Sequence, residues 1–107
     1  MQIPINESDW KLFRQKLPDW QEAYIDSLNR EYVSLLVGTG TASDKFWELE
    51  KRISSDKHRT GVSVRMSRSD MYQNLLALLQ DGVITLDNLA DFSIDLQEQM
   101  TFLIQNG

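Results

Sequence analysis

The stretch from Pro18 to Gly38, PDWQEAYIDSLNREYVSLLVG, constrains the fold more than any other part of the chain. Its large apolar side chains recur at spacings of three and four, which is the period of an α-helix. The apolar stripe consists of Trp20, Tyr24, Leu28, Tyr32 and Leu35 or Leu36. The pattern predicts the longest helix of the chain, and Gly38 stands where a left-handed C-terminal cap belongs.

The same helical period recurs before and after this stretch. Pro18 is expected to end a short first helix, because proline breaks a helix and suits the first turn of the next one. That first helix has a cap at Asn6 or Ser8, and its inner face carries Trp10, Phe13 and Leu17. Three later segments, MYQNLLALLQ, LDNLADF and IDLQEQMTFLIQ, begin after the capping residues Ser67, Thr85 and Ser93. They place apolar side chains on one face, namely Tyr72, Leu75, Leu76 and Leu79, then Leu96, Met100 and Leu103.

A further helix is predicted for DKFWELEKRISSDK, with Thr41 or Ser43 as its cap. Its apolar side would carry Phe46, Leu49 or Glu50, and Ile53, with Phe46 directed at the core. Glu48 and Arg52 are four residues apart and are expected to form an exposed ion pair.

The helical period stops near residues 58–67. There VSVRMS alternates apolar and polar side chains, which is typical of a strand. The segment MQIPI could pair with it only as an edge, because Pro4 lacks a backbone donor. A second copy of the chain or a plain loop are the other readings. We therefore predict one all-α domain over residues 1–107, a compact bundle of five or six amphipathic helices with a non-helical, possible short β connection near residues 58–67.

Composition excludes several classes of protein. The 107 residues contain no cysteine, which removes disulfides, thiolate catalysis and cysteine-based zinc sites. The N-terminus MQIPINESDWKLF does not resemble a signal peptide, and no apolar run approaches the length of a membrane span. We expect a cytoplasmic protein with no contact to a membrane.

Two loops resemble ligand-binding sites but lack the residues that such sites require. LLQDGVITLDNLADF resembles part of an EF-hand, but Ala77, Leu79 and Asn88 occupy positions that need strong oxygen ligands, so we expect no calcium. Instead, Gly82 would end one helix and Thr85 would cap the next. GTGTASDK lacks the Gly-Lys-Ser/Thr ending of a phosphate loop and follows a helix rather than a strand. A plain interhelical linker explains it better.

Nothing in the sequence forms a recognisable catalytic set. His58 is the only histidine, and its neighbours are Lys57 and Arg59 rather than carboxylates. No serine or zinc motif is present. We expect no enzymatic activity, no cofactor and no metal.

Charge is unevenly spread along the chain. Residues 1–44 hold seven acids and four bases, residues 45–68 three acids and seven bases, and residues 69–107 six acids with no Lys or Arg. The overall net charge of -5 argues against general nucleic-acid binding. The basic segment could contact an acidic partner, or it could neutralise the acidic C-terminal helices of its own fold or of a second copy.

The candidate contact residues lie in and beside this basic segment. Trp47 points about 100° away from Phe46 on a helix and is the kind of side chain that interfaces favour, although helical spacing alone also allows it a place in the core. The candidate interaction residues are Trp47, Arg52, Lys57, Arg59, Arg65 and Arg68.

Three blocks, DWKLFRQKLPDWQEAYIDSLNREYVSLL, SDKFWELEKRISSDKHRTGV and SRSDMYQNLLALLQDGVITLDNLADFS, resemble a group of short, uncharacterised bacterial proteins. SDKFWELEKRI is the most distinctive block. The resemblance covers nearly the whole chain and implies a free-standing cytosolic protein. It brings no activity and no functional residue with it.

These observations favour a non-catalytic protein-interaction or adaptor protein that self-associates, a homodimer being one form. One alternative is a small regulator that contacts nucleic-acid phosphates through residues 51–68. Another is a helical domain that binds a small ligand or is an enzyme, with a pocket between helices.

Overall fold

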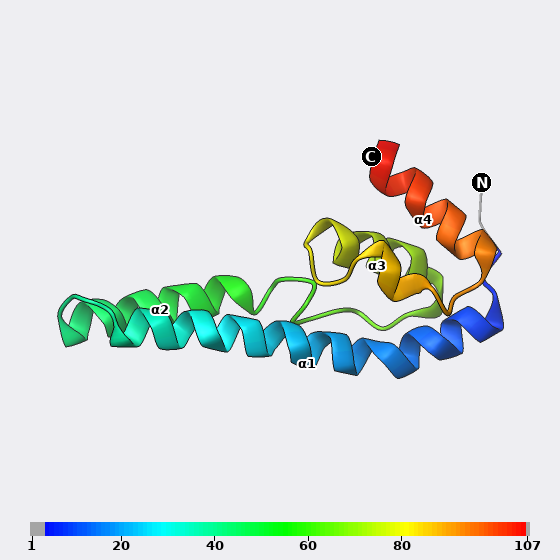
Figure 1. Ribbon diagram of the computed structural model, residues 1–107. Helices are drawn as coiled ribbons and strands as arrows, with labels where there is room; N and C mark the ends of the chain where they lie inside the picture. The colour runs from blue at the N-terminus through cyan, green and yellow to red at the C-terminus, as the bar shows by residue number, and fades with distance from the viewer. Residues whose placement is uncertain (1–3, 107) are drawn as a thin grey trace.

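The computed structural model describes residues 4–106, and every regular element within them is helical (Figure 1). The all-α prediction is confirmed. There are four α-helices rather than the expected five or six, with two short 3-10 turns and no strand in this part of the chain. The elements are α1 (Glu7–Val37), α2 (Ala42–Asp56), η1 (Arg68–Asp70), α3 (Met71–Gln80), η2 (Leu86–Leu89) and α4 (Ile94–Asn106).

The prediction that Pro18 separates two helices is wrong, because α1 runs through it for 31 residues. A proline inside a helix gives up one backbone hydrogen bond and costs about 3 kcal/mol. Packing on both sides of Pro18 offsets this loss: Phe13 and Leu17 are buried just before it, and Trp20 stacks on Phe92 with ring centroids 6.3 Å apart. At the start of α1, Asn6 is the cap, as predicted.

The molecule has two parts, which Figure 1 shows at opposite ends of a long shape. Its extents are 53 × 24 × 24 Å. We call the first part the body: residues 7–20 of α1 packed with α3, η2, α4 and the links that join these three. The second part is the arm, a hairpin of residues 24–37 of α1 with α2. The buried cluster lies entirely in the body and contains Phe13, Leu17, Met71, Leu75, Leu78, Ile84, Leu89, Phe92, Leu96 and Met100.

A buried carboxylate ties the two ends of the chain together inside the body. Asp9 on α1 is 2% exposed and accepts hydrogen bonds from the backbone N–H of Ser93 at 2.8 Å and from its hydroxyl at 2.5 Å. The Ser93 hydroxyl in turn accepts from the N–H of Leu96 at 3.2 Å, so Ser93 caps α4 as predicted. The start of α4 is therefore fixed to the first turn of α1.

The corner LLQDGVITLDNLADF has the structural role that the sequence indicated. Gly82 has a φ of 72°, a left-handed conformation that glycine adopts without strain. Ile84 is buried in the core, and the backbone N–H of Thr85 donates to the Asn88 side chain at 2.7 Å. The helix that Thr85 begins is a 3-10 turn rather than an α-helix.

Two other local expectations differ from the structure: the left-handed cap at Gly38 is wrong, and of the readings left open for residues 62–67 the loop holds rather than the strand. Gly38 has a φ of -74° and is not left-handed, whereas Gly40, two residues later, has a φ of 126°. The alternating segment VSVRMS forms no strand in the described part of the chain. Residues 63–67 run as an irregular link, and the Asn74 side chain donates to the carbonyl of Arg65 at 3.0 Å. The proposed partner segment MQIPI lies largely outside the described residues.

Candidate interaction site: the arm

Helix α2 packs on α1 through side chains spaced four, three and four residues apart. Lys45, Leu49, Arg52 and Asp56 are the partly or fully buried positions of this series. Phe46 lies one residue outside the series and is 60% exposed, so the prediction that it fills the core is wrong. Polar and charged residues occupy three of the four contact positions, which leaves the hairpin with few apolar side chains at its own interface.

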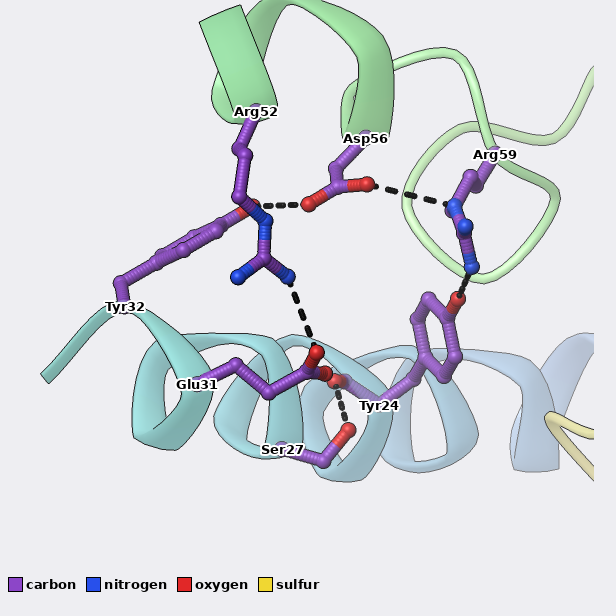
Figure 2. Close-up of polar contacts among 7 residues, drawn as sticks. All are labelled: Tyr24, Ser27, Glu31, Tyr32, Arg52, Asp56 and Arg59. Carbon is purple, nitrogen blue, oxygen red and sulfur yellow. Dashed lines mark hydrogen bonds and ion pairs between the residues drawn. The ribbon is translucent and has the colours of Figure 1, made fainter. Parts of the chain in front are cut away.

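A chain of polar contacts closes the base of the hairpin, as Figure 2 shows. The Tyr32 hydroxyl donates to Asp56 at 2.6 Å. The other oxygen of that carboxylate pairs with the Arg59 guanidinium at 3.2 Å, and Arg59 also donates to the Tyr24 hydroxyl at 2.9 Å. Asp56 is only 7% exposed, so this network satisfies a charge that would otherwise be costly to bury.

One edge of the hairpin carries an ion pair. Arg52 on α2 donates to Glu31 on α1 at 2.9 Å, and its guanidinium lies 5.4 Å from the centre of the Tyr32 ring. The expected pair between Glu48 and Arg52 is therefore wrong. Arg52 pairs with Glu31 of α1 rather than with Glu48 of its own helix because its side chain faces α1. There it also contacts the Tyr32 ring.

The network shifts two ionisation equilibria. Burial, followed by the hydrogen bond to Asp56, raises the pKa of Tyr32 from 10.0 to about 12. The hydrogen bond to Tyr24, then the negative charge of Asp56, raises the pKa of the Arg59 guanidinium above its ordinary value. Both groups therefore keep their protons at neutral pH.

Gly61 allows the loop after α2 to pack closely on α1 of the arm. A Cβ at this position would lie 2.2 Å from the Tyr24 ring, far inside van der Waals contact. The backbone can approach the ring this closely only because glycine has no side chain. The loop after α2 is thus held on α1 by Gly61 and Arg59 together, both of which contact Tyr24.

The opposite side of the hairpin exposes apolar side chains. Ile53 follows Phe46 by seven residues, so both lie on one side of α2. On α1, Val33 and Leu36 follow Asn29 by four and seven residues, and Asn29 lines a hollow together with Ile53. The four apolar residues therefore share one side, which we call the arm face. They are 45–60% exposed: Val33, Leu36, Phe46 and Ile53.

The hollow lies at the base of the arm face and has a volume of about 230 Å³. We call it the base pocket. It is mostly apolar, and the hydroxyl and carboxylate of Tyr32 and Asp56 are engaged with each other. Its lining residues are Ile25, Leu28, Asn29, Tyr32, Ile53, Asp56, Lys57 and Val62.

Trp47 lies at the outer edge of the arm face. It is 64% exposed, and its ring meets Phe46 edge to face with centroids 4.9 Å apart. Of the two readings that helical spacing left open, the exposed one therefore holds. The pair forms an aromatic projection near the tip of the arm, where Figure 1 places the start of α2.

The basic side chains named from the sequence do not gather into one unpaired patch. Arg52, Arg59 and Arg68 are engaged in ion pairs, the last of them with Glu7. Lys57 borders the base pocket, and Arg65 is exposed on the link between arm and body. These side chains are thus spread from the arm to the start of α1.

The expected match between the basic segment and the acidic C-terminal helices is not seen among the ion pairs of the described residues. The basic segment pairs with acids of α1 and with its own Asp56. The acid from residues 69–106 that enters an ion pair is Asp91, which pairs with Lys16 at 3.5 Å. Asp81, from the acidic C-terminal part, also raises the pKa of Arg59, but by less than Tyr24 and Asp56 do.

Several site residues were missed from the sequence: Tyr24, Val33, Leu36 and the buried Asp56. A signal was present for two of them. Val33 lies beside the predicted stripe, and Leu36 was one of the two alternatives for its last position, of which the half-buried Leu35 is the inner one; α1 therefore has more apolar residues than one contact face requires. No comparable signal marks Asp56.

Within residues 4–106, no helix is long and apolar enough to cross a membrane, and no group of three or more His, Asp or Glu residues is placed to hold a metal ion. No protein-family model matches the chain, and neither a curated protein nor a solved structure matches it.

Proposed function

We propose that this protein is a non-catalytic interaction protein that self-associates through the arm face. One observation carries the proposal: exposed apolar side chains are concentrated on the arm. Ten large apolar residues are exposed in the described part of the chain, and six of them lie on this hairpin. They are Val33, Leu36, Val37, Phe46, Trp47 and Ile53.

The body does not cover these side chains. Its own buried cluster is complete, and α2 contributes no residue to it. A contiguous apolar surface that the fold leaves in water marks an interaction site in a soluble protein. Phe46 and Trp47 are also of the residue types that provide most of the binding energy when an interface covers them.

The area of the arm face favours a weak dimer. The 15 residues of α2 are about 22 Å long, and two helices side by side are about 20 Å wide, so the arm offers a footprint on the order of 400 Å² per copy. The accessible area of projecting side chains exceeds this footprint, which brings the face toward the lower end of specific interfaces, about 600 Å² per partner. Such an interface predicts dissociation in the micromolar range rather than a permanent dimer.

Sedimentation equilibrium from micromolar to millimolar protein tests the proposal with a matched pair of variants. Phe46→Ala should weaken the dimer by about 30-fold or more, the effect of removing an aromatic anchor that the interface covers. Phe102→Ala is the control, because Phe102 is also 60% exposed but lies on α4 of the body. A strictly monomeric wild type, or equal weakening by both variants, would contradict the proposal.

A further inference from the structure

The arm face carries both a projection and a hollow, and they lie at different levels of the same side. Phe46 is near the tip, in the second turn of α2, while the base pocket surrounds the last turn of that helix. The levels are separated by about 14 Å, taking 1.5 Å per residue from Phe46 to the middle of the pocket-lining positions of α2. A second copy can fill the pocket only if its tip lies at the base of the first.

We propose that two arms dimerise antiparallel, so that Phe46 of each copy enters the base pocket of the other. This inference rests on the proposed self-association and specifies its geometry. In this arrangement a two-fold axis crosses the middle of the arm. Each copy then places its Phe46 in the base pocket of the other, so the same contact forms twice, as a self-complementary interface requires. Helix α2 then lies over the partner's α2, running in the opposite direction.

The pocket suits an aromatic ring from a second copy. Its volume of about 230 Å³ exceeds that of one phenyl group, and Ile25, Leu28 and Val62 line it with apolar atoms. Lys57 on its border would lie beside the incoming rings of Phe46 and Trp47, and a cation next to an aromatic face is favourable. Among the described residues, no buried polar side-chain atom lacks a hydrogen-bond partner, and the buried carboxylate of Asp56 in the pocket wall is already paired with Tyr32 and Arg59.

The stripe of α2 that would cross the axis has an internal symmetry. Ser43, Phe46, Glu50, Ile53 and Lys57 follow one another at intervals of three and four, which places them on one side of the helix. Glu50 is the central member. Antiparallel pairing therefore opposes Ser43 to Lys57 and brings the two Glu50 carboxylates together near the axis. That like-charge contact weakens the dimer and gives the arrangement a distinctive signature.

Cysteine crosslinking tests this register, because the chain has no cysteine of its own. The exposed positions Ser43 and Lys57 are changed separately, as Ser43→Cys and Lys57→Cys, and the two proteins are mixed at a concentration where sedimentation shows dimer. We expect a mixed disulfide dimer at least tenfold in excess of either homodimer. Glu48→Cys replaces Ser43→Cys in the control, since Glu48 lies on the edge of α2 that carries Arg52, and it should not crosslink with Lys57→Cys.

The outcomes separate this inference from the function on which it rests. A sample that sediments as a dimer without the Ser43–Lys57 crosslink overturns the antiparallel arrangement and leaves self-association standing. A monomer at all concentrations overturns both. As a second measurement, Glu50→Gln should tighten the dimer about twofold or more, because it removes the repulsion at the axis; weaker association of this variant would also contradict the arrangement.

Discussion

The body and the arm of this molecule are both helical, yet they are held together in different ways. The body buries ten apolar side chains in one cluster, and a buried carboxylate fixes its last helix to its first. In the arm, Leu28 is the apolar residue that reaches full burial, and contacts between tyrosine, aspartate and arginine replace a core. The body therefore buries its apolar side chains within its own fold, whereas the arm leaves apolar side chains exposed, and we propose that a second copy covers them.

The largest difference should appear when one apolar side chain is shortened in each part. Leu75 is completely buried in the body, and Leu75→Ala should lower the free energy of unfolding by about 2–5 kcal/mol. Leu49→Ala, in the half-buried contact between α2 and α1, should cost only about 1 kcal/mol because the side chain leaves less apolar area to lose. Chemical denaturation at a concentration below that of the dimer measures both, and equal losses would contradict the comparison.

The link inside the body should be nearly as sensitive. Asp9→Ala removes the acceptor for two hydrogen bonds from Ser93 and leaves a part-buried donor unpaired, which should cost about 1–3 kcal/mol. Thermal unfolding measures the loss. Asp19→Ala is the matched control, because Asp19 is an exposed carboxylate on the same helix, and its removal should change stability by less than about 0.5 kcal/mol.

The connection between arm and body can be broken at Gly61. Gly61→Ala places a methyl group against the Tyr24 ring and should destabilise the fold by about 1–3 kcal/mol, the usual effect of overpacking. A double-mutant cycle identifies the cause: in a Tyr24→Ala background the same change should cost much less, because the ring that it strikes is gone. An undiminished cost in that background would show that Tyr24 is not the obstacle.

The smallest expected effect is on the pH dependence of the arm. The pKa of Tyr32 is raised from 10.0 to about 12, so the unfolded chain loses this proton first as the pH rises. The folded state binds more protons in that window, and stability should therefore fall between pH 10 and pH 12. Tyr32→Phe should make this fall shallower in alkaline denaturation curves. Tyr24→Phe, which removes a neighbouring hydroxyl without touching Asp56, is the control, and an identical slope in wild type and Tyr32→Phe would contradict the assignment.

The sequence was most informative about the body. Helical spacing identified Phe13, Leu17, Leu75, Leu96 and Met100 as inward-facing, and all five are buried. The capping residues Asn6, Thr41 and Ser93 also act as predicted. These features depend on residues near one another in sequence, so local patterns contain the necessary information.

The arm was harder to predict, because its arrangement depends on contacts between distant residues. In the arm, local rules gave Glu48 as the partner of Arg52, just as they gave Pro18 as a helix end in the part of α1 that belongs to the body. Tertiary packing carried α1 through the proline, and Glu31 of α1 took Arg52. The exposure of Phe46 was unexpected for the same reason: a helix with apolar residues on two sides does not reveal which side its own chain will cover.

Hydrogen exchange measured at two protein concentrations, one below and one above the onset of dimer, tests the central claim most directly. If a second copy covers the arm face, amide exchange should slow at the higher concentration in α2 and in residues 25–37 of α1. Exchange in α3 and α4 should stay the same, because the body is complete without a partner. Slowing in α4, or no concentration dependence anywhere in the arm, would contradict the claim that the arm is the interaction site.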